Sequence, residues 1–312
     1  MEIIHVNDNL ILDDKIIATI GEFDGLHRGH MKLINECNSL AKTNNCKSGL
    51  ICFYPHPDYV LNKRKYEAYL TELNEKIEIL ENNNIDYLFI VKCDMNLLKL
   101  DKYTFYDKYL KDFYGLVVGF DFHFGYLGKG DSFYLKELFK NKIFSIVSEE
   151  SYVNENKEIK KISSNDIRMF LEEGKLSIAN ELLGYNYNFK GIVEKGKGLG
   201  RKLAYPTANI NIDKEKFIPR NGDYACIINI CGKLYQGMCN IGKNPSLDDL
   251  HDARIEAHIF DFNEDIYDEL IKIEIVEFIR DEITFDNIED LRKQISLDKE
   301  QTITFFRSFN YE

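Results

Sequence analysis

Mainly apolar runs alternate with helical patterns along the first half of the chain. The runs lie at residues 16–20, 50–53, 87–91, 116–118 and 143–147, and apolar residues between several of them recur at helical spacing. Such runs indicate strands that are covered on both faces, and strands that alternate with helices indicate a parallel sheet. The pattern therefore predicts an α/β domain of the Rossmann-like type.

Two further helical patterns follow the serine pair at 163–164, and the first ends at Gly174 and the second at Gly184. From about residue 186 the pattern changes to short alternating segments separated by turn residues, which predicts an antiparallel barrel or sandwich. Apolar residues at helical spacing within 285–306 predict a terminal helix packed on that barrel. A length of 312 residues suits two domains, and we place them at 1–185 and 186–312.

Charge and cysteine content narrow the class of protein. The net charge of −12 argues against a protein that coats nucleic acid or binds an anionic membrane. Seven cysteines with no C-x-x-C pair indicate reduced thiols, as is typical of the cytosol. We find neither an export signal nor 18 consecutive apolar residues. We therefore expect a cytoplasmic protein without nucleic-acid or membrane partners, either a monomer or a weak homo-oligomer.

The stretch GEFDGLHRGH at 21–30 directly follows the first apolar run. A strand, a glycine-rich turn and a helix that begins near His27 place backbone N–H groups at a helix N-terminus, where anions bind. His27 and His30, three residues apart, lie on one side of the first turn. They form a candidate phosphate clamp, although a zinc pair or a capped turn with surface histidines fits the same short motif.

The same stretch is similar to the signature of the HxGH nucleotidyltransferases, in the form found in bacterial bifunctional riboflavin kinase/FMN adenylyltransferases. Six further segments resemble this family and occur in its order along both domains. They are CFYPHP (52–57), VVGFDFHFGYLGKGD (117–131), ISSNDIRMFLEEGKLSIANELLG (162–184), GIVEKGKGLGRKLAYPTANI (191–210), QGMCNIGKNPS (236–246) and IEAHIFDFNEDIYDELIKIEIVEFIRDEITF (255–285).

For the first domain the resemblance implies attack by the FMN phosphate on the α-phosphorus of ATP, which gives FAD and pyrophosphate. No strong base is needed, because a phosphomonoester is mostly dianionic at neutral pH. The resemblance makes His27 and His30 catalytic contacts to the ATP phosphates, with Mg²⁺. It further assigns ATP and phosphate binding to Gly21, Phe23, Asp24, Gly25, Ser163, Ser164 and Arg168, and flavin or nucleoside binding to Pro55, His56, Pro57 and Asp121.

Some of these residues have ordinary structural readings. Ser164 is also a plausible helix N-cap, Ser163 forms a possible capping box with Asp166, and His56 fits a loop histidine. The chain also departs from the family, which usually has arginine at His123 and threonine at Asn165.

In the second domain, Thr207 and Asn209 alternate along an extended segment, so both face one way and their oxygens suit a hard cation. By resemblance they hold Mg²⁺ and an ATP phosphate, and Glu256 accepts the proton of the riboflavin 5′-hydroxyl. Glu256 also fits an ordinary outward-facing strand residue. A basic loop that contains Gly196, Gly198, Gly200 and Arg201 suits nucleotide phosphates, or is a solvated hairpin tip.

Departures in this half include Asp223, where the family usually has an apolar residue. None of them removes a proposed catalytic group.

The resemblance identifies a two-domain FAD synthetase whose substrates and products are riboflavin, FMN, FAD and ATP, with Mg²⁺ accompanying ATP. In it, an α/β nucleotidyltransferase domain precedes an antiparallel β-barrel kinase domain with a C-terminal helix. One alternative is a nucleotidyltransferase for another phosphate ester, such as phosphopantetheine, with the barrel as an accessory domain. The other is a flavin-binding or regulatory protein that retains only one activity or neither.

Overall fold

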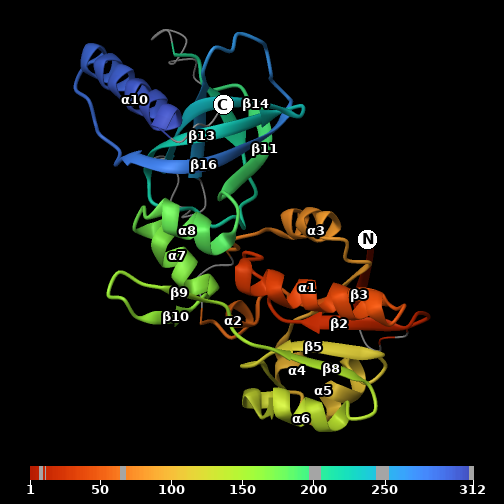
Figure 1. The fold of residues 1–312 in the computed structure, drawn as a ribbon. Helices are drawn as coiled ribbons and strands as arrows, with labels where there is room; N and C mark the ends of the chain where they lie inside the picture. The colour runs from red at the N-terminus through yellow and green to blue at the C-terminus, as the bar shows by residue number, and fades with distance from the viewer. Residues whose placement is uncertain (7–9, 11, 64–67, 197–204, 244–252, 309–312) are drawn as a thin grey trace. The chain divides into compact units, whose positions relative to one another are not determined.

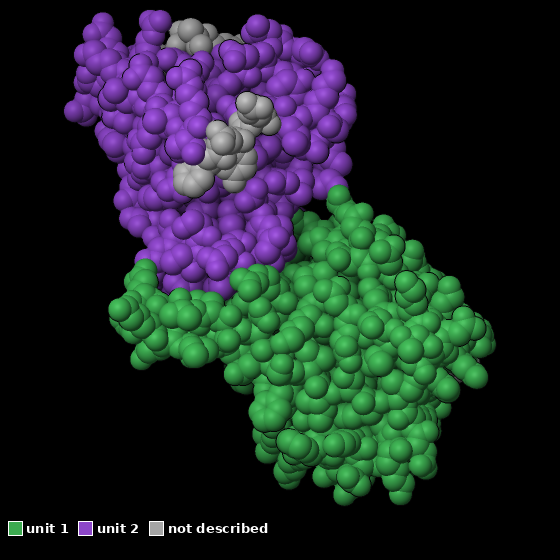
Figure 2. Space-filling model, viewed as in Figure 1, with its two compact units in different colours: residues 1–164 green, residues 165–312 purple. Residues whose placement is uncertain are grey.

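The structure is a computed structural model that describes residues 1–6, 10, 12–63, 68–196, 205–243 and 253–308 (Figure 1). The chain forms two compact units, Met1–Ser164 and Asn165–Glu312, which Figure 2 colours green and purple. Among the described residues, every helix is too short or too polar to cross a lipid bilayer.

A six-stranded parallel sheet forms the centre of the first unit. Its strands run in the order β1-β4-β3-β2-β5-β8, and every neighbouring pair is parallel. Their bounds are β1 Glu2–Val6, β2 Ile16–Ile20, β3 Lys47–Tyr54, β4 Tyr87–Lys92, β5 Gly115–Gly119 and β8 Ile143–Val147. The five predicted strands are confirmed. The sequence did not indicate β1, because this edge strand is mostly exposed and lacks a buried apolar run.

Helices cover both faces of this sheet (Figure 1). On one face lie α1 Arg28–Thr43 and α3 Leu73–Asn82, which bury Ile34 and Leu80 against the sheet. On the other face lie α4 Met95–Leu98, α5 Lys102–Tyr109 and α6 Ser132–Leu138. Smaller elements complete the unit: α2 Pro57–Val60, β6 His123–Phe124, η1 Tyr126–Gly128, β7 Gly130–Asp131, β9 Ser151–Val153 and β10 Ile159–Lys161.

The strand order reverses between β2 and β5. The chain passes from β2 through β3 to β4 on one side, and it then crosses to β5 and β8 on the other. In open α/β sheets, ligands bind in the crevice at the carboxyl ends of the strands where such a reversal occurs. The segments directly after β2 and β5 are 21–27 and 120–122, so the fold places the GEFDGLHRGH stretch at this crevice.

The second unit contains a closed antiparallel barrel, which confirms that expectation and decides against a sandwich. Its strands run in the order β11-β12-β15-β14-β13-β16. They are β11 Asn188–Glu194, β12 Ala208–Asn211, β13 Gly222–Ile230, β14 Lys233–Lys243, β15 Ala253–Ile259 and β16 Leu270–Arg280. Helices α7 Ser164–Glu172 and α8 Leu176–Leu183 precede it, and both glycines predicted to end them have left-handed φ values, +73° and +83°.

The terminal helix α10 Ile288–Ser308 lies against the barrel strands β13, β14 and β16 (Figure 1). Its buried residues are Asp298, Thr302 and Phe306, whereas Ile288 is 62% exposed. The apolar stripe expected from Ile288 onward therefore becomes a packing face only further along the helix.

The compact unit that contains the barrel also includes α8 and nearly all of α7. The sequence analysis instead predicts that both helices belong to a first domain that ends at residue 185. A division by compactness and a division by function need not coincide, so the 185/186 boundary stays a prediction.

Candidate active sites

The two histidines of GEFDGLHRGH form a stacked pair at the start of α1. His27 is the N-cap residue, and its Nδ1 accepts a hydrogen bond from the His30 backbone N–H at 3.4 Å. The two rings stack with centroids 3.7 Å apart and planes 19° from parallel. The buried Phe23 ring lies 5.1 Å from the His30 ring and supports it from the side. The pair is therefore fixed by the turn that precedes it.

Both histidines are neutral at neutral pH. Burial lowers the pKa of His27 to about 4, an effect that Asp24 opposes and Lys161 reinforces. Burial also lowers the pKa of His30 well below its usual value, with a further contribution from His27. Because Nδ1 of His27 accepts a hydrogen bond, its proton sits on Nε2. Nδ1 of His30 is buried and has no hydrogen-bond partner among the described residues.

Gly29 leaves room for the His27 ring beside the first turn of α1. A Cβ atom at Gly29 would lie 3.1 Å from Cε1 and 3.2 Å from Nδ1 of His27, closer than side chains normally pack. Gly29 was not among the predicted site residues, although its place between the two histidines was a usable signal.

Asp24 braces the glycine-rich turn from inside. Its carboxylate is 1% exposed and accepts hydrogen bonds from the backbone N–H groups of Leu70 at 2.8 Å and Thr71 at 3.4 Å. Gly25 N–H donates to the Thr71 hydroxyl at 3.0 Å. The Asp24 carbonyl accepts a hydrogen bond from the Ser164 hydroxyl at 2.8 Å. Ser164 is thus the first residue of α7 and is held to the turn, rather than preceding the helix as its N-cap.

Basic side chains that the sequence analysis did not select lie beside these residues. The Arg28 guanidinium donates to the Glu150 carboxylate at 3.0 Å, and Lys32 Nζ donates to the Ser148 hydroxyl at 3.0 Å. Lys161 forms an ion pair with Asp121 and lowers the pKa of both histidines. These cations come from segments distant in sequence, and only Arg28 stood inside a recognised motif.

The predicted flavin-binding residues follow β3 and β5. His56 caps the short helix α2, which begins at Pro57, and its Nδ1 accepts a hydrogen bond from Asp58 N–H at 3.1 Å. Its Nε2 lies 3.8 Å from a carboxylate oxygen of Glu22. Pro55 immediately follows β3, and Asp121 lies two residues beyond β5.

His123 and Arg168 belong to two of the family-like segments. The His123 Nδ1 lies 2.8 Å from the Asp121 carbonyl oxygen. Arg168 belongs to the second compact unit, where its guanidinium lies 5.7 Å from the centre of the Phe217 ring.

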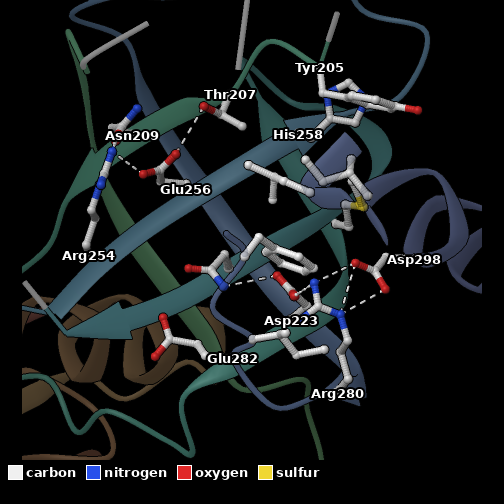
Figure 3. Close-up of a pocket in the computed structure, with 16 residues that line it drawn as sticks. Tyr205, Thr207, Asn209, Asp223, Arg254, Glu256, His258, Arg280, Glu282 and Asp298 are labelled. Atoms are coloured by element: carbon white, nitrogen blue, oxygen red, sulfur yellow. Dashed lines mark hydrogen bonds and ion pairs between the residues drawn. The ribbon is translucent and has the colours of Figure 1, made fainter. Parts of the chain in front are cut away.

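A pocket of about 480 Å³ opens on the outer wall of the barrel beside α10 (Figure 3). One cluster of polar side chains lies at one end of the pocket and a second lies near α10, with apolar side chains between the two clusters. The lining residues are Tyr205, Thr207, Asn209, Asp223, Met238, Asn240, Arg254, Glu256, His258, Arg280, Glu282, Ile283, Phe285, Leu291, Ile295 and Asp298.

Thr207, Asn209 and Glu256 meet at the first polar end of this pocket (Figure 3). The Thr207 hydroxyl donates to a Glu256 carboxylate oxygen at 3.3 Å. Arg254 donates from Nε and Nη2 to the Asn209 amide oxygen, both at 3.3 Å, and pairs with the Glu256 carboxylate. Ile255 is completely buried in the barrel wall, so the strand alternation turns Glu256 outward into the pocket. Thr207 and Asn209 face the same pocket, as their alternation predicts.

Gly196 lies directly against Asn209. A Cβ atom at Gly196 would lie 2.3 Å from Nδ2 of Asn209, so any larger residue would displace the Asn209 side chain. Gly198, Gly200 and Arg201, the other predicted phosphate-binding residues of this loop, lie outside the described residues.

His258 is a pocket residue that the sequence analysis did not select. Its Nδ1 lies 2.9 Å from the Pro206 carbonyl oxygen, which can only accept, so Nδ1 carries the proton. Burial lowers the pKa of His258, and its Nε2 is buried without a hydrogen-bond partner among the described residues. It follows Glu256 by two residues on β15, and this i, i+2 spacing was the available signal.

The donors at this end suit a cation that arrives with a phosphate. Thr207 and Asn209 offer neutral oxygens, which are hard ligands of the kind Mg²⁺ prefers. In the part of the chain that the structure describes, no group of three His, Cys, Asp or Glu residues could hold a metal ion. Thr207 and Asn209 are therefore the residues at this end of the pocket that would hold a hard divalent cation.

The chain matches two family models in succession, one for FAD synthetase over residues 11–166 and one for riboflavin kinase over residues 183–306. It is 34% identical to the bifunctional riboflavin kinase/FMN adenylyltransferase of Bacillus subtilis, with 98% of each chain covered. It is 36% identical to the enzyme of the same name from Buchnera aphidicola subsp. Schizaphis graminum, with 93% of each chain covered.

Among solved structures, a macrolide-efflux protein from Streptococcus pneumoniae has a similar fold, with a TM-score of 0.86 and 28% identity. The match covers 97% of this chain and 99% of that one. The two family models match successive parts of the chain, and relatives above 30% identity match nearly its whole length, so the family of the chain is established. The chain belongs to the bifunctional riboflavin kinase/FMN adenylyltransferase family, whose members convert riboflavin to FMN and FMN to FAD with ATP.

Proposed function

We propose that the barrel pocket is the riboflavin kinase site and that Glu256 is its general base. The observation that carries this proposal is the convergence of Glu256, Thr207 and Asn209 at one end of a single pocket. An alcohol is a poor nucleophile until its proton leaves, so phosphorylation of the riboflavin 5′-hydroxyl calls for a base. Glu256 accepts that proton, and Arg254 holds the carboxylate in place.

The character of the pocket suits riboflavin. Its volume of about 480 Å³ lies within the range of small-molecule sites, roughly 300–1,000 Å³. Apolar side chains, among them Met238, Phe285 and Ile295, offer a surface for a flat ring system. The polar end lies apart from them, so a ligand with an aromatic ring and a hydroxylated chain can satisfy both regions.

Thr207 and Asn209 would hold Mg²⁺ at the kinase site, and Gly196 lies close to Asn209. The ion supplies charge neutralisation for the transferred phosphoryl group. Arg254, which donates to Asn209 in the free protein, adds a positive charge on the same side.

We further propose that the GEFDGLHRGH turn is the adenylyltransferase site. Neutral His27 carries an Nε2–H donor, the His30 ring stacks on it, and the N-terminus of α1 adds its positive dipole end. Ser164 is joined to the same turn through Asp24, which supports a role for residues 163–164 near the phosphates. The reaction needs positioning and charge neutralisation more than a base. We assign the two activities to residues 1–185 and 186–312, and the matched ranges support this order.

The two assignments are tested together by following products from riboflavin, ATP and Mg²⁺ on a column that separates the flavins. Glu256→Gln should abolish FMN formation while FMN added directly is still converted to FAD. His27→Asn should accumulate FMN and form little FAD. If Glu256→Gln still phosphorylates riboflavin at more than about a tenth of the wild-type rate, the base lies elsewhere.

A further inference from the structure

A row of polar side chains crosses the barrel wall from Glu256 to the C-terminal helix. Residues opposite one another in neighbouring antiparallel strands point to the same face of a sheet. Four cross-strand pairs connect strands β12, β15, β14, β13 and β16 in turn: Asn209 with Glu256, Glu256 with Asn240, Asn240 with Asp223, and Asp223 with Arg280. All five residues line the pocket. The row joins the proposed base to the wall beside α10.

Asp223 is held at both of its carboxylate oxygens. Oδ1 accepts a hydrogen bond from Asn240 Nδ2 at 3.0 Å, and Oδ2 lies 2.6 Å from Arg280 Nη2. Only 16% of its side chain is exposed. A carboxylate this far from water is costly unless it is paired, so these two contacts decide where it sits.

Arg280 continues the connection to α10 (Figure 3). Its Nε and Nη2 donate to the Asp298 carboxylate at distances between 2.7 and 3.1 Å, and its Nη1 donates to the Asp281 carbonyl at 2.9 Å. Asp298 is 4% exposed and also accepts from Gln294 on the same helix at 2.9 Å. One guanidinium thus lies between a carboxylate on the barrel and a carboxylate on the helix.

We propose that Asp223 is a positioning residue for riboflavin binding: through Arg280 it fixes α10 against the barrel and so sets the pocket wall opposite Glu256. This inference rests on the assignment of the pocket to riboflavin. Leu291 and Ile295 of α10 line that pocket, so a helix held less firmly alters the surface that receives the ring. Asp223 itself lies at the polar end of the pocket away from Glu256, beside Arg280 and Asp298 (Figure 3).

The test compares Asp223→Asn and Asp223→Val in the full-length protein. The first removes the charge at nearly constant shape, and the second is an apolar residue of the kind that the family resemblance leads one to expect at this position. Glu274→Gln is the matched control, because Glu274 forms another barrel ion pair, with Lys272 at 2.9 Å, and does not line the pocket. Three quantities are measured: riboflavin KM and kcat for FMN formation, FAD formation from added FMN, and amide hydrogen exchange in residues 288–308.

We expect both Asp223 variants to raise riboflavin KM about tenfold, the loss typical of one charge-assisted hydrogen bond. We expect kcat to stay within about twofold of the wild-type value and amide exchange in α10 to rise. Glu274→Gln should change neither riboflavin KM nor exchange in α10. Asp223→Asn and Asp298→Asn act through the same Arg280, so their combined effect on KM should be less than the product of the two.

An unchanged riboflavin KM in both Asp223 variants would overturn the proposal, and so would a loss confined to kcat. A fall in thermal stability without a change in KM would also overturn it, because Asp223 would then serve the fold alone. If the pocket is not the riboflavin site, Glu256→Gln keeps its activity while α10 exchange still rises in Asp223→Asn. That result separates a wrong pocket from a wrong role for Asp223.

Discussion

Acidification from pH 7 to pH 5 should destabilise the first unit through its buried histidine pair. His27 keeps a pKa of about 4 in the folded chain, against 6.5 when exposed. Between these values the unfolded chain binds a proton that the folded chain does not. The contribution of neutral His27 to stability is therefore fully present above the unfolded pKa and is lost as the pH falls from about 6.5 toward 4.

The size of the effect follows from the two pKa values. One pKa unit corresponds to about 1.4 kcal/mol, and at pH 5 the unfolded His27 is almost fully protonated while the folded one is almost fully neutral. Protonation of His27 alone then lowers the free energy of unfolding by about 2 kcal/mol between pH 7 and pH 5. His30 adds a loss of the same sign, because burial lowers its pKa as well.

Hydrogen exchange of the α1 amides at the two pH values, corrected for the intrinsic effect of pH on exchange, gives the local free energy of opening. The control is His27→Asn, since asparagine is among the best N-cap residues and does not titrate. The variant should lose about 2 kcal/mol less than the wild type over this interval. Equal losses in the two proteins would refute the reasoning, because His27 would then not be neutral by burial.

Three further substitutions have outcomes that the geometry determines. Gly29→Ala crowds the His27 ring at 3.1 Å, so FAD formation from FMN should fall at least about tenfold, while helix stability, measured by thermal unfolding, is unchanged or rises by up to about 1 kcal/mol. Gly196→Ala places a Cβ 2.3 Å from Asn209, and steady-state assays should show a higher ATP KM for riboflavin phosphorylation with FAD formation from FMN unaffected. Arg280→Met leaves two buried carboxylates without their shared cation, and denaturant unfolding of the barrel should show a loss of about 3–5 kcal/mol.

The sequence by itself determined most of the elements and the residues with evident chemistry. Five apolar runs became strands of the parallel sheet, because strands buried on both faces leave a continuous apolar signature. Alternation also predicted that Thr207 and Asn209 face one way and that Glu256 turns outward. These features depend on local periodicity, which can be recognised from neighbouring residues in the sequence alone.

Only the tertiary structure decided how distant segments meet. Strand order places the turn after β2 at the reversal point of the sheet, and no local pattern encodes that order. The His27 ring, which stacks on His30, lies so close to Gly29 that a Cβ atom there would crowd it. Asp223 reads in sequence as a departure from an apolar position, and it becomes part of a bridge only because barrel closure brings Arg280 beside it and α10 adds Asp298. Charge pairing of this kind depends on distances in space, which the spacing of residues along the chain does not fix.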